Sequence, residues 1–253
     1  MKRYTVFTAR FVLVPMIGGT FVVSQTGRAS GLEWAHIVAG FATIYLIFGL
    51  LLMSVRHGQI RLQASVALAL GLLEAIPGMP RLHAAVSPVL FASLAWAAIA
   101  LPSGQETARA KNRWIFLLPA LVLLPILYGV GYRHKTSGFL SHIGAALLVA
   151  GLLLGFCMVM NERHPANTKL RRACNITIAA VLFQLVFGTV VFIVRLLEID
   201  GGLLLAYART AHITGGGLVL AASTELAVQY RLKAAHMPND TVKWRSDSTG
   251  GDV

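Results

Sequence analysis

Residues 139–160 read FLSHIGAALLVAGLLLGFCMVM, a stretch of apolar and small residues with one histidine near its start and no Lys, Arg, Asp or Glu. A helix needs roughly 20 such residues to cross the hydrocarbon core of a bilayer. Similar stretches recur along the chain. We therefore predict an all-α, polytopic membrane protein with eight transmembrane helices, at approximately residues 8–25, 34–55, 61–78, 83–101, 114–132, 139–160, 173–195 and 210–229.

The composition excludes several classes of protein. Of the 253 residues, 56% are hydrophobic and 13% are charged, and the mean hydropathy is +0.69. Soluble domains carry about 25% charged residues, so a soluble enzyme, a DNA-binding protein and a disordered chain are all excluded. Two cysteines do not form a disulfide framework. The net charge of +12 has to be explained by where the basic residues lie, and we expect no nucleic-acid partner.

Basic residues are unevenly divided between the two sides of the expected membrane. If the N-terminus is inside, sixteen Lys and Arg residues fall on the inner side and six on the outer side, which places both termini in the cytoplasm. We interpret residues 8–25 as a retained first helix, because no small-residue cleavage site occurs there and more spans follow. The absence of a transit-like segment favours a prokaryotic cytoplasmic membrane. The polar tail 236–253 is expected to be disordered. The six outer residues are Arg28, Arg81, Arg133, Lys135, Arg195 and Arg209.

Four of the eight histidines form a pattern. His36, His83, His142 and His212 open the second, fourth, sixth and eighth expected helices, all on the outer side. Any one of them could be a tolerated residue at the membrane interface, but four at equivalent positions are poorly explained by chance. Ionisable residues within spans are costly and usually mark function. The other four histidines lie in expected loops or the tail.

The histidine pattern predicts an internal repeat of two pseudo-symmetric four-helix bundles. Residues 1–105 would form the N-terminal half with the pair His36 and His83, and residues 106–235 the C-terminal half with the pair His142 and His212. Small residues follow each histidine and clear a flat space, although they also permit close helix packing without a ligand. Two imidazoles without nearby thiolates or carboxylates suit zinc poorly. They fit axial ligation of haem iron better.

Basic residues close to these histidines suggest how an anionic group would be held. Arg81 precedes His83 by two positions, and Arg209 precedes His212 by three. An arginine pairs well with a carboxylate such as a haem propionate. Ordinary loop charge is an equally good explanation for each residue alone.

These features together resemble the haem A synthase family. The resemblance covers residues from about 5 to 232 and rests on four features. They are Thr26-Gly27 with Gly31, the motif Glu33-Trp34-Ala35-His36, the four helix-heading histidines, and Gln184-Leu-Val-Phe-Gly188.

The resemblance implies a function, cofactors and partners. The family oxidises the C8 methyl group of haem O to a formyl group and so makes haem A. His36 and His83 would flank the substrate haem O, His142 and His212 would hold a relay haem b, and Glu33 would lie beside the substrate as a catalytic carboxylate. Implied partners are the lipid bilayer, a haem O-producing farnesyltransferase, a quinol or other electron donor, and oxidase assembly factors.

Several alternatives stay open on the residues alone. Glu33 could move protons, orient His36, or simply cap its helix. Glu74 could donate a proton to the substrate site or line a water-filled notch beside Pro77. The chain lacks the family's outer-loop cysteine pair, because residues 24–33 contain no cysteine. Cys157 and Cys174 are expected to be buried or near-surface thiols toward the inner ends of their helices.

Two other functions compete with a haem A synthase-like oxidase. A non-catalytic subunit for electron transfer or assembly, holding haem b in both pairs, would need the same ligands. A transporter is a weaker alternative, because its repeats would be expected to bring broken helices and polar residues to the middle of the membrane.

Overall fold

The computed structural model describes residues 1–24, 30–57, 60–76, 79–100, 114–199 and 202–234. All secondary structure in these ranges is helical. The helices are α1 (Lys2–Phe11), α2 (Leu13–Ser24), α3 (Ser30–His57), α4 (Arg61–Glu74), α5 (Pro80–Ala100), the 3₁₀ turn η2 (Trp114–Phe116), α6 (Leu117–Arg133), α7 (Phe139–Arg163), α8 (Thr168–Leu196) and α9 (Gly202–Ala234).

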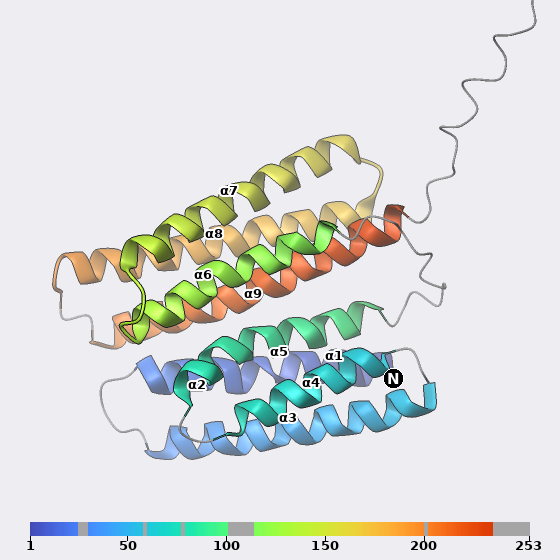
Figure 1. The fold of residues 1–253 in the computed structure, drawn as a ribbon, viewed down its shortest axis with the longest axis horizontal. Helices are drawn as coiled ribbons and strands as arrows, with labels where there is room; N and C mark the ends of the chain where they lie inside the picture. The colour runs from blue at the N-terminus through green and yellow to red at the C-terminus, as the bar shows by residue number, and fades with distance from the viewer. Residues whose placement is uncertain (25–29, 58–59, 77–78, 101–113, 200–201, 235–253) are drawn as a thin grey trace, which may run out of the picture.

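The helices lie along one common direction in two groups. Figure 1 shows α1–α5 gathered on one side and α6–α9 on the other, with the long axes of both groups along the length of the molecule. Helix α9 lies between the groups, because it packs against α2 and α5 as well as against α6 and α8. A buried apolar core therefore continues from one group into the other, and includes Met16 and Leu90 together with Val149 and Leu220.

Six helical segments in the described part of the chain are long and apolar enough to cross a membrane. They are Lys2–Val22, Gly31–Val55, Pro80–Ile99, Trp114–Arg133, Phe139–Arg163 and Thr168–Leu196. The other two expected spans correspond to α4 and α9. Helix α4 has 14 residues, and α9 contains polar residues that lower its hydropathy. The eight-span count therefore stays a prediction.

Two helix boundaries differ from the prediction because of proline. The expected helix 8–25 is divided at Val12 into α1 and α2. Pro15 cannot donate the hydrogen bond that would continue the helix through this turn. The expected helix 61–78 ends at Glu74, because a residue before proline, here Ile76, is disfavoured in helical conformation.

Two other helices extend further than their charged residues suggest. Helix α8 begins at Thr168 rather than near residue 173, with the side chain of Asn167 accepting a hydrogen bond from the backbone N–H of Leu170 at 3.0 Å. Helix α9 begins at Gly202 rather than near residue 210. A helix satisfies its own backbone hydrogen bonds, so it continues past the edge of an apolar span.

The two cysteines are buried free thiols, as predicted. Cys157 on α7 and Cys174 on α8 lie in a small apolar cluster with Leu170, Ala173 and Leu226.

Candidate functional site

The structure brings the four patterned histidines together as two pairs. The ring centroids of His36 on α3 and His83 on α5 are 5.7 Å apart, and the ring planes meet at 90°. The rings of His142 on α7 and His212 on α9 are 6.0 Å apart and meet at 87°. The two pairs thus have nearly the same geometry although they are built from different helices. We call them the N-terminal pair and the C-terminal pair.

The histidines do not all head their helices, contrary to prediction. His83 and His142 lie in the first turns of α5 and α7, but His36 lies well inside α3 and His212 well inside α9. The prediction placed helix starts at the edge of the apolar stretch, whereas α3 and α9 continue beyond it. The shared feature is the pairing of the rings rather than their distance from a helix end.

Three of the four rings are held by the backbone of the helix that precedes them. A carbonyl oxygen only accepts hydrogen bonds, so each of these bonds places the ring proton on Nδ1. Nε2 is then left with a lone pair, which is the form of histidine that binds a metal ion. The three bonds are from His36 Nδ1 to the Pro15 carbonyl at 3.0 Å, from His142 Nδ1 to the Pro125 carbonyl at 2.9 Å, and from His212 Nδ1 to the Gln184 carbonyl at 3.3 Å.

A glycine lies one helical turn after each of these carbonyls and makes room for the ring. A Cβ atom built on any of the three would meet the imidazole Cε1 at 3.0 Å or less. Such contacts are closer than packed carbon atoms normally approach. The pairs are Gly19 with His36 at 2.5 Å, Gly129 with His142 at 3.0 Å, and Gly188 with His212 at 2.8 Å.

The N-terminal pair opens onto a cavity of about 180 Å³ between α2, α3, α4 and α5. Its lining includes both rings of the pair, Gly71, Glu74 and Ser87. The carboxylate of Glu74 interacts with Ser87 and, electrostatically, with His83. Its Oε1 atom is buried and has no hydrogen-bond partner within the described structure. Glu74 is therefore the acidic group positioned at this pair.

The helices that hold the C-terminal pair carry uncharged polar side chains instead. Gln184 Oε1 and Thr214 Oγ1 are buried and lack hydrogen-bond partners in the described ranges. Gly215 leaves the space in which the Gln184 side chain lies, because a Cβ there would collide with its amide oxygen. Buried polar atoms without partners are costly. One such oxygen, on Glu74, thus lies in the lining of the cavity at the N-terminal pair, and another belongs to Gln184, whose carbonyl holds His212.

Glu33 takes a less central position than the sequence predicts. It lies in the first turn of α3, its side chain is exposed, and it is absent from the lining of the cavity. Its three-residue spacing from His36 puts both on one side of the helix. A direct role at the cavity stays a prediction for Glu33.

The predicted outer arginines gather near one another at the end of the molecule that carries the histidines. Arg209 lies within electrostatic range of Arg133 and Arg195. Arg81 and Arg133 both lie within electrostatic range of His134, in the loop between α6 and α7. The pKa of His134 is lowered by desolvation and, further, by these two cations. Arg81 of the N-terminal half and Arg209 of the C-terminal half therefore belong to one region of positive potential.

The geometry of each pair fits two imidazoles on one metal ion. A metal–imidazole bond is about 2.0 Å long, so rings on opposite sides of a metal have centres roughly 6 Å apart. No group of three or more His, Cys, Asp or Glu that could hold a metal occurs among the described residues. Each pair on its own offers two imidazoles, so a metal held there would need its other ligands from a bound group such as a planar macrocycle.

Sequence reasoning singled out Gln184 and Gly188 without their role, and it missed Pro15 and Pro125 as residues that hold the rings. Pro15 and Pro125 act through their backbone carbonyls, and every residue type has one, so residue identity does not reveal this role. Their spacing is informative, because Pro15 to Gly19 and Pro125 to Gly129 repeat the four-residue spacing of Gln184 to Gly188. The expected Thr26, Gly27 and Arg28, and the tail 236–253, lie outside the described residues.

Comparison of the chain with family models, with curated proteins and with solved structures gives no match.

Proposed function

We propose that this chain is a haem-binding membrane oxidoreductase of the haem A synthase type, built from two pseudo-symmetric halves. The observation that carries the proposal is the pair of matching imidazole arrangements, with centroid separations of 5.7 and 6.0 Å and near-perpendicular rings. The N-terminal pair would hold haem O as the substrate, and the C-terminal pair would hold haem b. A bound haem b supplies one-electron transfer.

The residues of the chain prepare each pair before anything binds. Hydrogen bonds to the Pro15, Pro125 and Gln184 carbonyls leave the Nε2 lone pair of three rings available. Such outer-shell bonds fix the orientation of a ligating histidine. Arg81 and Arg209 would pair with anionic propionates. The cavity of about 180 Å³ is below the roughly 300–1,000 Å³ of small-molecule sites, so flanking side chains would move aside to admit a macrocycle.

The two halves would have different tasks because their polar surroundings differ. The N-terminal pair has the carboxylate of Glu74 beside it, whereas Gln184, whose carbonyl holds His212 in the C-terminal pair, is uncharged. A carboxylate can accept or donate a proton, and an amide or hydroxyl at neutral pH does so poorly. Proton movement during oxidation of the substrate would therefore take place in the N-terminal half.

Two further helices would complete the eight spans. Helix α9 would cross the membrane surrounded by protein, since residues such as Ala206, Leu220 and Leu226 are almost fully buried. Polar residues in a span are tolerated where they face other helices. Helix α4 would cover about 21 Å at 1.5 Å per residue, and would need the residues that follow it to finish the crossing.

The test is an absorption spectrum of the purified full-length protein, with extraction and mass analysis of its haems. We expect a Soret band, and haem O, haem A or an oxidised intermediate besides haem b. His142→Ala is expected to remove haem b and keep the substrate haem, and His36→Ala is expected to do the reverse. His164→Ala, at the other end of α7, is the matched control. The absence of any Soret band would exclude the proposal.

A second candidate function is a non-catalytic subunit that holds haem b in both pairs for electron transfer or assembly. The exposed position of Glu33, away from the cavity lining, favours it. Such a protein would contain only haem b and would not convert haem O in cells that lack their own enzyme.

A further inference from the structure

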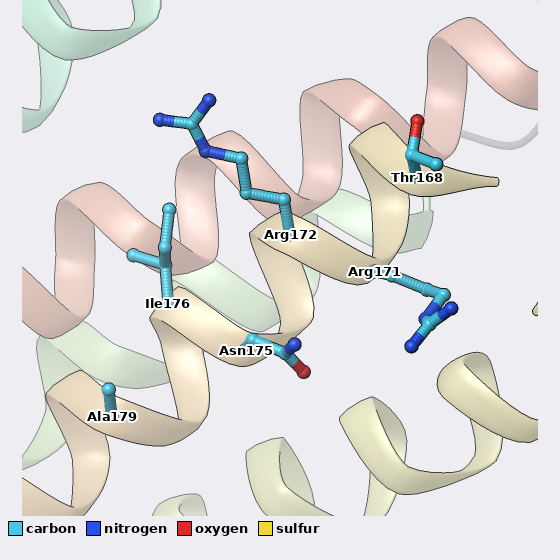
Figure 2. A pocket seen from close by; sticks show the side chains of 6 residues that line it. All are labelled: Thr168, Arg171, Arg172, Asn175, Ile176 and Ala179. Atoms are coloured by element: carbon cyan, nitrogen blue, oxygen red, sulfur yellow. The ribbon is translucent and has the colours of Figure 1, made fainter.

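A shallow groove lies on α8, at the end opposite the histidines, and plays no part in the haem proposal. It has a volume of about 440 Å³, and all six residues of its lining are exposed. Figure 2 shows Arg171 and Arg172 extending from the helix in different directions, with Asn175 in the next turn. The lining is Thr168, Arg171, Arg172, Asn175, Ile176 and Ala179.

The chemistry of this face changes along the helix. Its first turns carry a hydroxyl, two guanidinium groups and an amide, and the following turns carry Ile176 and Ala179. The exposed face then continues with Leu182, Phe183 and Val186. Residues three and four apart share one side of a helix. A polar head followed by an apolar surface is the same order of groups that a phospholipid presents from its headgroup to its acyl chains.

The position of the arginines along α8 places them at the membrane boundary. Arg172 and Arg195 are separated by a stretch without charged residues that spans roughly 35 Å at 1.5 Å per residue. The hydrocarbon core is about 30 Å thick, so both arginines reach the headgroup regions on opposite sides. The groove therefore lies where a lipid phosphate lies.

Of the two arginines, Arg171 keeps the greater capacity to bind an anion, because no carboxylate pairs with it among the described residues, whereas Arg172 is partly balanced by Glu225. Arg171 donates one hydrogen bond to the carbonyl of Pro165 at 3.2 Å, which uses one of its five N–H groups. Arg172 interacts with Glu225 on α9. Asn175 accepts a hydrogen bond from Asn161 at 3.1 Å, so its own amide N–H₂ stays available as a donor.

We propose that this groove binds the phosphate headgroup of an anionic membrane lipid, with its acyl chains along Ile176 and Ala179. Basic pockets at membrane-facing helix ends bind anionic headgroups through this combination of charge and apolar surface. The site is independent of the histidine pairs and would be occupied whether or not haem is bound.

Native mass spectrometry of the detergent-solubilised full-length chain tests the proposal by counting bound lipids. Phosphatidylglycerol, phosphatidylcholine and inorganic phosphate serve as separate probes. We expect phosphatidylglycerol to be retained in preference to phosphatidylcholine, and Arg171→Gln with Arg172→Gln to weaken its binding by about fivefold per arginine. The double variant Arg163→Gln with Lys169→Gln removes equal charge from exposed positions outside the groove. It is expected to bind as the native chain does.

Three results would overturn the proposal. They are equal retention of the two lipids, equal losses in the groove and control variants, and complete displacement of phosphatidylglycerol by inorganic phosphate. Circular dichroism and thermal unfolding establish that each variant is folded. If the groove double variant does not fold, for example because Arg172 no longer balances Glu225, Arg171→Gln alone is measured and an effect of about fivefold is expected.

Discussion

At the scale of single residues, the histidine rings are positioned by backbone rather than by side chains. The bonds from Nδ1 to the Pro15, Pro125 and Gln184 carbonyls cannot be removed by changing only the side chain of the accepting residue. The glycine one turn later can be changed, because it alone allows the ring to lie against the preceding helix. These glycines are therefore the best points at which to test the arrangement.

We predict that Gly19→Ala disturbs the N-terminal pair and Gly18→Ala does not. The two glycines are neighbours on α2, but a Cβ at Gly19 would lie 2.5 Å from His36 Cε1, whereas Gly18 has open space. Overpacking of this kind costs about 1–3 kcal/mol. Thermal unfolding should therefore show a lower stability for Gly19→Ala alone, and the spectrum should show altered haem binding in the N-terminal half. Equal behaviour of the two variants would contradict the packing described here.

Glu74 and Glu33 can be separated by matched substitutions. We predict that Glu74→Gln retains both haems but slows conversion of haem O by about 100-fold or more, the usual size of a lost proton-transfer group. Glu33→Gln, which changes an exposed residue outside the cavity, should have the smaller effect. Haem extraction from cells that express each variant measures conversion. A larger loss for Glu33→Gln would assign the proton transfer to Glu33 instead.

The candidate site could be predicted from the sequence only in part. Histidine is costly in an apolar span, so the spacing of His36, His83, His142 and His212 indicated the two pairs. Spacing does not determine which acid turns toward a ring, and it is Glu74 rather than Glu33 that lines the cavity. The carbonyl partners were also unpredictable, because every residue has a carbonyl and only the packing of two helices selects one.

At the scale of elements, α9 holds the two groups of helices together. It packs against α2 and α5 on one side and against α6 and α8 on the other. Gly217 lies at this contact, because a Cβ there would lie 3.2 Å from Met16 Cε and 3.8 Å from Pro88 Cα. A flexible methionine can move, but the backbone of α5 cannot move without separating the helices.

We predict that Gly217→Leu destabilises the protein by at least about 1–3 kcal/mol, as expected for overpacking against backbone. Gly151→Leu on α7 is the matched control, because the same side chain would enter open space. Thermal unfolding in detergent compares the two. A similar midpoint for both variants would mean that α9 does not pack closely against α2 and α5.

Helix positions were predictable where a span is uniformly apolar, as in α7. They were less predictable at ends, since Lys and Arg mark the edge of the membrane rather than the end of a helix. Thr168 and Gly202 therefore begin helices earlier than expected. Helix α9 is the hardest case, because burial among other helices permits polar residues that lower its apparent hydropathy.

At the scale of the whole molecule, the distribution of basic residues predicts which face is cytoplasmic. We predict that Thr136→Cys reacts with a membrane-impermeant maleimide in intact cells, and that Pro165→Cys reacts only after the membrane is opened. Both positions are exposed, and they lie in loops at opposite ends of α7. The native chain is the control, because Cys157 and Cys174 are fully buried. The reverse labelling pattern would invert the topology.

The central place of α9 also has a consequence for biosynthesis. The ribosome makes this helix after the other described helices, yet it supplies His212 and packs against α2 and α5. A nascent chain that stops before residue 202 would have one complete ring pair. The faces of α2, α5, α6 and α8 that α9 contacts would be left exposed. Assembly of both ring pairs must therefore wait until residues 202–234 have been made, and a stop codon just before residue 202 would leave the C-terminal pair without His212.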